Sequence, residues 1–495
     1  MQELLGTKGQ KLSDMNKMGL PVPYGFIISK TVSGKYYEEN HYLDDEIRSQ
    51  IIEKINELQE ITGALKVVLN GAISCDVKNL IDNVIQMYEA GEPDEFPIVV
   101  QEEIAQFDEE VIYTRDIETG EKNIEKQVSS VMRSFDIAKV CNLLEKKYKA
   151  VQRVSFAYVT QEDATEKMYV LSTEDAKLSY YSEIKTAVDL VNEGIITKNE
   201  ALKSLDANKF PKTDKILDGS ALSKLLDWAD DIREVKIRTE IKSAEDVKLA
   251  RGVGADAVEF YIGLQNLKRG ELAKIYDKVE DYGFSFRISD CKRAVVNPDI
   301  VAKQVKELIV AAINCAREKD INVRLEFIVP IAGAEKEMKY LEELINSTAN
   351  SAFEEENFEI PYFISALIET PRAAINTSGI AKYCDLMVFD VQRLTEYSFG
   401  LSERTIKGVT EDYKIYGLLE DDPIKSIDRE GVGRMIDYAI NHALSSKPKM
   451  KFGLVGPQTI DEETMRFAVE KNISFISCKI ADVARMRIIS AQVLL

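Results

Sequence analysis

The chain has 495 residues, of which 45% are hydrophobic and 30% charged, and its formal net charge at pH 7 is −20. This length predicts two or three domains, and the composition is that of an ordered globular protein. The acidic charge disfavours nucleic acid and anionic membranes as partners. The chain has no apolar run long enough to span a bilayer, no signal sequence in MQELLGTKGQ and no CxxC pair among its six cysteines, so we expect a cytoplasmic protein.

The sequence pattern of the N-terminal half predicts an α/β domain with antiparallel strand pairing. It opens with a Gly-rich turn at 5–29, LGTKGQKLSDMNKMGLPVPYGFIIS, in which Gly19 and Pro21 mark the end of a helix. Strand-like runs follow at 96–104, FPIVVQEEI, and at 110–115, EVIYTR.

A boundary between two domains is indicated where a helical pattern gives way to a polar segment. Residues 173–205 are expected to be helical, and the Pro-containing stretch ANKFPKTDK follows them at 207–215. We therefore place a linker at 207–217, between a first domain at 1–206 and a second domain at 218–495.

The second half alternates short β-branched or aromatic runs with amphipathic helical stretches. In one such stretch, at 297–320, Asn297 can cap the helix and Pro298 suits its first turn. The alternation predicts parallel strands with helical crossovers, and eight such strands predict a closed (β/α)8 TIM barrel. The predicted strands are 235–241, 257–262, 284–289, 324–330, 362–369, 385–390, 451–456 and 475–479.

Active sites of such barrels lie at the carboxyl ends of the strands. The stretch LIETPRAAINTSGIAKYCDLMVFDVQRLTE at 367–396 contains two predicted strands, which deliver Glu369 and Arg393 to that edge. A carboxylate there is a natural metal ligand, whereas a guanidinium repels a metal. The alternatives are a metal-dependent centre and a site that has lost its metal. The residues expected at this edge are Ile262, Arg287, Asp290, Glu369, Arg393, Val455 and Cys478.

Several segments resemble pyruvate phosphate dikinase and phosphoenolpyruvate (PEP) synthase, which are PEP-utilising enzymes. GTKGQKLSDMNKMGLPVPYGFIIS, at 6–29, is similar to the opening of the family's nucleotide-binding domain, and IKTAVDLVNEGIITKNEAL, at 184–202, to a later part of that region. LLDWADDIREVKIRTEIKSAEDVKLARGVGADAVEF, at 225–260, and LIETPRAAI, at 367–375, are similar to its PEP-binding barrel. The resemblance is collinear and covers most of the chain. It implies a truncated, ATP-grasp-like α+β domain followed by a TIM barrel.

The resemblance also implies that one part of a dikinase is missing. A dikinase needs an ATP site, a swivelling domain with a phosphorylatable histidine, and a metal-dependent pyruvate site. In the family the histidine domain precedes the barrel, but here roughly two dozen residues separate the two matching regions, which is too few for a domain. Neither His41, in ENHYL, nor His442, in INHAL, stands in a Gly-Gly-x-Thr-Ser-His type of motif. We expect His41 at the surface and His442 on an amphipathic helix.

At the nucleotide site, the resemblance assigns a phosphate contact to Lys8 in GTKG. A lysine between glycines suits that role, and the alternative is a flexible turn with a solvated lysine. The family's other contacts are replaced by Leu69, Ser155, Ser172 and Glu174. Because leucine and glutamate stand where the family has arginines, we expect ATP to bind weakly or not at all.

In the barrel, the resemblance implies an anion site with fewer contacts than the family has. A phosphate-gripping arginine of the family aligns with Ile262, whereas Arg287 and Asp290 match its next arginine and aspartate. Val455 stands where the family has its proton-donating cysteine, and Cys478 matches a cysteine outside the chemistry. We therefore expect no catalytic residue, with Arg287 and Asp290 as substrate contacts and Cys478 in the core.

The family's metal site is altered as well. Glu369 matches a metal-ligating glutamate, but the second metal ligand, an aspartate after asparagine, aligns with Arg393 after Gln392. Enolpyruvate chemistry needs a divalent cation and an acid, and one carboxylate is a poor magnesium site. We expect Glu369, Gln392 and Arg393 to bind substrate, with Arg393 paired to Glu369 and no metal. The alternative is an ion pair that only caps the barrel.

Three functions are compatible with these residues. The first is a dikinase-like protein without dikinase activity that acts as a binding, scaffolding or regulatory subunit. The second is a repurposed barrel that binds or transforms a small anionic metabolite, similar to PEP or pyruvate, without metal. The third is residual phosphotransferase function with a full-length dikinase partner. The family uses Mg and ATP, but we expect no cofactor here, and the family's association predicts a homodimer through the barrel.

Overall fold

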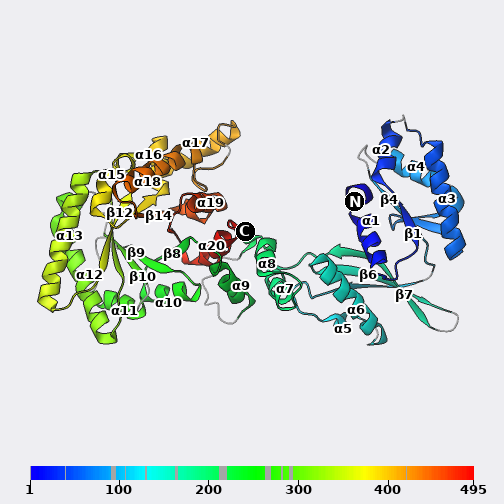
Figure 1. Cartoon of the computed structure of the whole chain (residues 1–495), viewed down its shortest axis with the longest axis horizontal. Helices are drawn as coiled ribbons and strands as arrows, with labels where there is room; N and C mark the ends of the chain where they lie inside the picture. The colour runs from blue at the N-terminus through cyan, green and yellow to red at the C-terminus, as the bar shows by residue number, and fades with distance from the viewer. Residues whose placement is uncertain are drawn as a thin grey trace. The chain divides into compact units, whose positions relative to one another are not determined.

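A computed structural model of the chain forms two compact units, Met1–Ile196 and Thr197–Leu495 (Figure 1). Among the residues that the structure describes, no helix has both the length and the apolar character needed to cross a membrane. The described residues are 2–38, 41–90, 96–105, 107–128, 131–161, 165–210, 220–261, 269–279, 283–288, 294–419 and 421–495.

The first unit contains two antiparallel sheets, one with strands in the order β1-β4-β2-β3 and one in the order β5-β6-β7. One hydrophobic core surrounds Leu58 and Tyr88, and another surrounds Met15 and Phe156. The elements of this unit are α1 (Gln2–Lys17), β1 (Gly25–Ile28), α2 (Lys30–Glu38), α3 (Asp45–Thr62), β2 (Lys66–Leu69), β3 (Ile73–Asp76), η1 (Val77–Asn79), α4 (Leu80–Ala90), β4 (Ile98–Glu102), β5 (Asp108–Tyr113), α5 (Ile124–Gln127), α6 (Val131–Tyr148), β6 (Gln152–Thr160), β7 (Glu166–Asp175) and α7 (Tyr180–Asn192).

The two strands predicted for this half are confirmed as β4 and β5, and both pair antiparallel. The prediction of helix from residue 173 onward is wrong at its start, because Thr173 and Asp175 belong to β7. Their side chains are tied to Gln152 on β6, with Thr173 Oγ1 donating to Gln152 Oε1 at 3.0 Å and Gln152 Nε2 donating to Asp175 Oδ1 at 2.9 Å. The helical part begins only at α7.

The boundary between the units lies before the predicted linker. The second unit begins at Thr197, and α8 (Lys198–Ser204) and η2 (Ala207–Lys209) belong to it. Gln492 Nε2 donates to the carbonyl oxygens of Leu202, at 2.7 Å, and Leu205, at 2.9 Å. The residues expected to start the linker form η2, and Arg485 on the C-terminal helix donates to the backbone oxygen of Ala207 at 3.2 Å and to Asn208 Oδ1 at 2.7 Å. Residues 211–217 lie outside the described part of the chain.

The predicted eight-stranded barrel is confirmed. Strands in the order β10-β11-β12-β13-β14-β15-β8-β9 close on themselves, and the neighbouring pairs are parallel. Figure 1 shows helices around the outside of these strands. The strands are β8 (Lys236–Ile241), β9 (Ala257–Tyr261), β10 (Gly283–Arg287), β11 (Leu325–Val329), β12 (Tyr362–Ile368), β13 (Leu386–Asp390), β14 (Lys451–Val455) and β15 (Phe475–Cys478).

The helices of this unit follow the strands as crossovers. They include α12, with Pro298 in its first turn as the sequence predicts. Besides α8 and η2, the helical elements are α9 (Ala221–Asp230), α10 (Ala244–Gly252), α11 (Arg269–Val279), η3 (Ala294–Val296), α12 (Pro298–Lys319), α13 (Glu335–Glu356), α14 (Pro371–Ile375), α15 (Thr377–Ile380), η4 (Ala381–Tyr383), α16 (Val391–Phe399), α17 (Glu403–Ile415), η5 (Arg429–Gly433), α18 (Arg434–Ser446), η6 (Pro457–Ile460), α19 (Glu462–Glu470) and α20 (Ile480–Gln492).

The inside of the barrel is divided into an apolar part and a polar part. Ile328, Leu367, Val388 and Phe475 belong to one buried hydrophobic cluster that spans several strands. Polar side chains occupy inward positions on β8 to β12 and β15: Arg238, Glu259, Ser285, Glu326, Ser365 and Ser477. This polar part lies on the strands that also line the cavity described below.

Candidate functional site

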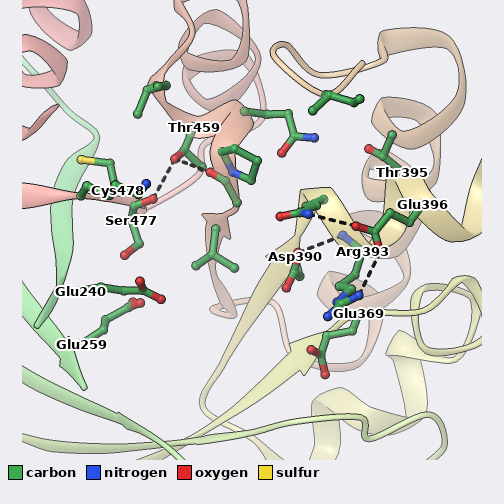
Figure 2. Close-up of a pocket in the computed structure, with 18 of the residues that line it drawn as sticks. Glu240, Glu259, Glu369, Asp390, Arg393, Thr395, Glu396, Thr459, Ser477 and Cys478 are labelled. Carbon is green, nitrogen blue, oxygen red and sulfur yellow. Dashed lines mark hydrogen bonds and ion pairs between the residues drawn. The ribbon is translucent and has the colours of Figure 1, made fainter. Parts of the chain in front are cut away.

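A cavity of about 1310 Å³ lies at the carboxyl ends of the barrel strands, where the fold places active sites (Figure 2). Of the predicted substrate-binding residues, Arg287, Glu369, Gln392 and Arg393 line it, as do Val455 and Cys478. The structure therefore brings together residues that are more than a hundred positions apart in the chain. Asp290 and Ile262, which were predicted for the same edge, lie outside the described residues.

Arg393 stands in the first turn of α16 and pairs locally. Asp390, the last residue of β13, caps this helix and accepts a hydrogen bond from the Arg393 backbone N–H at 3.0 Å. Arg393 Nη1 lies 2.9 Å from Glu396 Oε2, and Gln392 Nε2 donates to the other oxygen of Glu396 at 2.9 Å. The predicted pair between Arg393 and Glu369 is thus wrong. Glu396 is three residues further along the same helix, on the same helical face, and pairs with the guanidinium instead.

Glu369 lies in the cavity wall after β12. Its Oε2 accepts a hydrogen bond from the backbone N–H of Ile331 at 2.9 Å. Ile331 has a φ of 55°, which is unusual for a β-branched residue, so this bond holds a strained turn after β11. Within the described part of the chain, no group of three or more His, Cys, Asp or Glu residues is arranged to hold a metal ion.

Three further cavity residues were missed by the sequence analysis: Glu240, Glu259 and Ser477. Glu240 on β8 is in register with Glu259 on β9, and Figure 2 shows their carboxylates on one wall of the cavity, opposite the wall with Glu369 and Arg393. Ser477 stands on β15, which pairs with β8. The signal that could have identified Glu259 is its place in AVEFYI, since a charged residue inside a buried strand demands a partner.

Glu259 is only 7% exposed and has a weak ionic partner. Arg238 Nη1 is 3.7 Å from Glu259 Oε1 but 2.8 Å from Glu326 Oε2 and 3.0 Å from Ser285 Oγ. Burial is the main cause that raises the pKa of Glu259, and the charge of Glu326 adds to the rise. The charges of Arg238 and Arg287 and the Ser477 side chain oppose it, and the net shift of this pKa is upward. The better-paired carboxylate is Glu326, which also accepts from Ser365.

Asp390 is the second cavity carboxyl group with a raised pKa. Burial is the main cause, while the hydrogen bond from the Arg393 backbone N–H and the charges of Arg287 and Arg393 oppose it. Arg287 therefore influences Glu259 on one side and Asp390 on the other, which places its guanidinium among the acidic groups of the cavity. Burial likewise raises the pKa of the Cys478 thiol, whose side chain belongs to the core as predicted.

In the first unit, Lys8 lies near a turn between β2 and β3. Lys8 Nζ donates to the backbone oxygen of Asn70 at 2.6 Å, and Gly71, with a φ of 72°, follows beside it. Burial lowers the pKa of Lys8, and Glu174 opposes this shift. Leu69, at the predicted position of a nucleotide-binding arginine, is fully buried in β2. Whether ATP binds here stays a prediction.

The two histidines lie as the sequence predicts. His41 is exposed, and His442 lies on α18, where its Nδ1 is 2.9 Å from the backbone oxygen of Tyr438 and its ring stacks on the Tyr438 ring.

Comparisons with known protein families match two regions of the chain. The family described as "Pyruvate phosphate dikinase, AMP/ATP-binding domain" matches residues 2–101, and the one described as "PEP-utilising enzyme, PEP-binding domain" matches residues 288–495. The two matches fall in the first unit and in the barrel.

Individual relatives point to the same family. The chain is 25% identical to pyruvate, phosphate dikinase of Clostridium symbiosum over 61% of this chain and 33% of the relative, and 30% identical to the Rhizobium meliloti (strain 1021) protein over 45% and 25%. It thus spans a third or less of these relatives. Among solved structures, it is 15% identical to an HpcH/HpaI aldolase from Desulfitobacterium hafniense DCB-2, covering 52% of this chain and 89% of that chain with a TM-score of 0.32.

Replacing Glu259 by glutamine should stabilise the protein in a pH-dependent way. A carboxyl group whose pKa is raised by folding contributes stability below its unfolded pKa, about 4.3 for glutamate, and that contribution is lost as the pH rises. Thermal unfolding should therefore give Glu259→Gln a Tm about 2–4 °C above the unsubstituted protein at neutral pH, with the difference shrinking toward about pH 4. The exposed Glu245→Gln on α10 is the matched control and should show no such trend. A Glu259→Gln protein that is less stable at neutral pH would contradict this assignment.

Proposed function

The chain belongs to the family of pyruvate phosphate dikinase-like, PEP-utilising enzymes, and we propose that its barrel binds a small carboxylate ligand without metal and outside the dikinase cycle. The observation that carries this proposal is the local pairing of Arg393. The residue that aligns with a metal ligand of the family is a cation, and Glu396 holds it in the cavity wall at 2.9 Å. The role that follows is that of a binding or regulatory subunit.

The donor set of the cavity does not fit the family's magnesium. Magnesium takes near-octahedral oxygen ligation, usually with one or two carboxylates and several waters. Here one oxygen of Glu369 accepts the Ile331 backbone N–H at 2.9 Å, and the Arg393 guanidinium lines the same cavity. The positive charge of the Arg393 guanidinium disfavours a metal ion beside it, so the proposed binding involves no metal.

The residue best suited to hold an anionic ligand is Arg287. It ends β10 at the rim of the barrel and lines the cavity. A guanidinium presents a planar fork that matches the two oxygens of a carboxylate. Because Arg287 is surrounded by Glu259 and Asp390, the ligand's carboxylate would have to compete with protein carboxylates, which favours a ligand that also makes contacts elsewhere in the cavity.

The histidines support the absence of a dikinase cycle within these 495 residues. The family's carrier histidine must travel between two sites, and the chain has only His41 and His442. His442 is fixed on α18 by its contact with Tyr438, and His41 lies in the first unit. Association as a homodimer through the barrel is part of this proposal. Residual phosphotransferase function with a full-length dikinase that supplies the carrier is the alternative to it.

Binding of pyruvate or PEP should depend on Arg287 and should not depend on a divalent cation. Calorimetry is expected to give the same Kd with EDTA and with added magnesium, and Arg287→Ala should weaken binding about tenfold, as for loss of a charged hydrogen-bonding partner. Arg324→Ala, an exposed arginine at the opposite end of β11, is the matched control. Binding that disappears in EDTA and returns with magnesium would sink the metal-free proposal.

The purified protein should form no PEP from pyruvate, ATP and phosphate, because Val455 stands where the family has its proton donor and no carrier histidine is present. A coupled assay of PEP formation measures this. Addition of a full-length dikinase to the same mixture is the positive control. Turnover that persists after contaminating dikinase has been removed would overturn the proposal.

A further inference from the structure

Several buried polar atoms in the wall of the cavity have no hydrogen-bond partner among the described residues. These are Glu259 Oε1, Ser477 Oγ and Gln458 Oε1, and all three residues line the cavity. Glu259 Oε1 lies 3.7 Å from Arg238 Nη1, and the Ser477 side chain is close enough to Glu259 to lower the pKa of that carboxyl group. Glu259 and Gln458 are more than nine-tenths buried. Buried polar groups in folded proteins are nearly always paired. Because these three atoms belong to residues that line one cavity, a ligand that presents hydrogen-bond donors could bind to them.

Two further carboxylates lie near Glu259. Glu240 stands beside Glu259 in the register of β8 and β9, and Glu326 lies deeper in the barrel. Arg238 is bonded to Glu326 at 2.8 Å and stacks on the Phe475 ring, with its guanidinium carbon 3.5 Å from the ring centroid. It is therefore fixed away from Glu259, to which it approaches only to 3.7 Å. A cationic group of a ligand could form the close ion pair with Glu259 that Arg238 does not form.

The carboxylate-binding residue stands close to this wall. Ser285 on β10 is in register with Glu259, and Arg287 follows two residues later on the same inward side. Two residues along a strand correspond to roughly 6.6 Å, and the side chains of arginine and glutamate can span part of that separation. A small molecule with opposite charges a few bonds apart can thus meet both groups.

We propose that the ligand of this site is an amino acid, or a related small molecule that bears both a carboxylate and an ammonium group. This inference rests on the proposed function, since Arg287 holds the carboxylate, and it adds that Glu259 and Glu240 receive the ammonium. An ammonium group has three donors and no acceptor, which matches Glu259 Oε1. A metal ion is a poorer occupant, because the described residues offer no group of three or more metal ligands.

The test compares three acids with the same three-carbon skeleton: L-alanine, L-lactate and pyruvate. Calorimetry with the full chain in EDTA should give L-alanine a Kd at least about tenfold below that of pyruvate, with L-lactate between them, because only L-alanine brings a charged donor. Glu259→Gln should abolish this preference, so that the ratio of the two Kd values for L-alanine and pyruvate moves to about one. The exposed Glu245→Gln, which changes the charge equally outside the cavity, should retain the preference.

A second variant tests the same wall of the cavity without changing a buried residue. Glu240 is exposed, so Glu240→Gln is compatible with folding and should reduce the preference for L-alanine about threefold. Equal affinity for the three acids, or a preference that survives in Glu259→Gln, would overturn this inference. Failure of the proposed function has a different signature, because Arg287→Ala would then leave the affinity for pyruvate unchanged.

Discussion

Inside the barrel, the guanidinium of Arg238 lies close to one carboxylate and farther from a second. The electrostatics of the cavity depend on this difference. Arg238 donates to Glu326 at 2.8 Å and is 3.7 Å from Glu259. Removing an ionised carboxylate from water costs a great deal of free energy unless hydrogen bonds and opposite charge replace the solvent. Glu326 has close replacements, whereas Glu259 has only the more distant charge of Arg238 beside it. Burial therefore raises the pKa of Glu259 in spite of that charge.

On the opposite wall of the cavity, the position of Arg393 is set by the N-terminus of α16. Asp390 ends β13 and immediately caps the helix, so Arg393 and Glu396 fall on one helical face and pair. This local pair replaces the contact across the barrel mouth with Glu369, which instead bonds to the turn after β11. The cation in this wall is therefore paired within its own helix.

The fold was largely predictable because its signals are local. Most strands of the parallel barrel are short, mainly apolar runs, as expected for strands covered on both faces, and all eight predicted runs proved to be strands. The capping of α16 was also within reach, since DVQRLTE places an aspartate before the helix and an arginine three residues before a glutamate. The docking of Ala207 and Asn208 on Arg485 was not predictable, because it joins residues far apart in the chain.

The site was less predictable, because the strand register decides which charged side chains lie next to each other. Nothing within AVEFYI tells which residue on β8 will stand beside Glu259, or that Arg238 will prefer Glu326. Such preferences depend on which neighbours the closed barrel brings together and how much water they lose. The resemblance to PEP-utilising enzymes identified Arg287 and Glu369, whereas Glu240, Glu259 and Ser477 could be recognised only once the strands were placed.

We propose that the carboxyl end of the barrel does not bind a divalent metal ion, and a crystal soaked in manganese tests this most directly. The anomalous signal of manganese reports an occupied site without any assumption about activity. We predict no anomalous peak at Glu369, with Arg393 still bonded to Glu396. Manganese bound to Glu369, with Arg393 turned away from the cavity, would contradict the account.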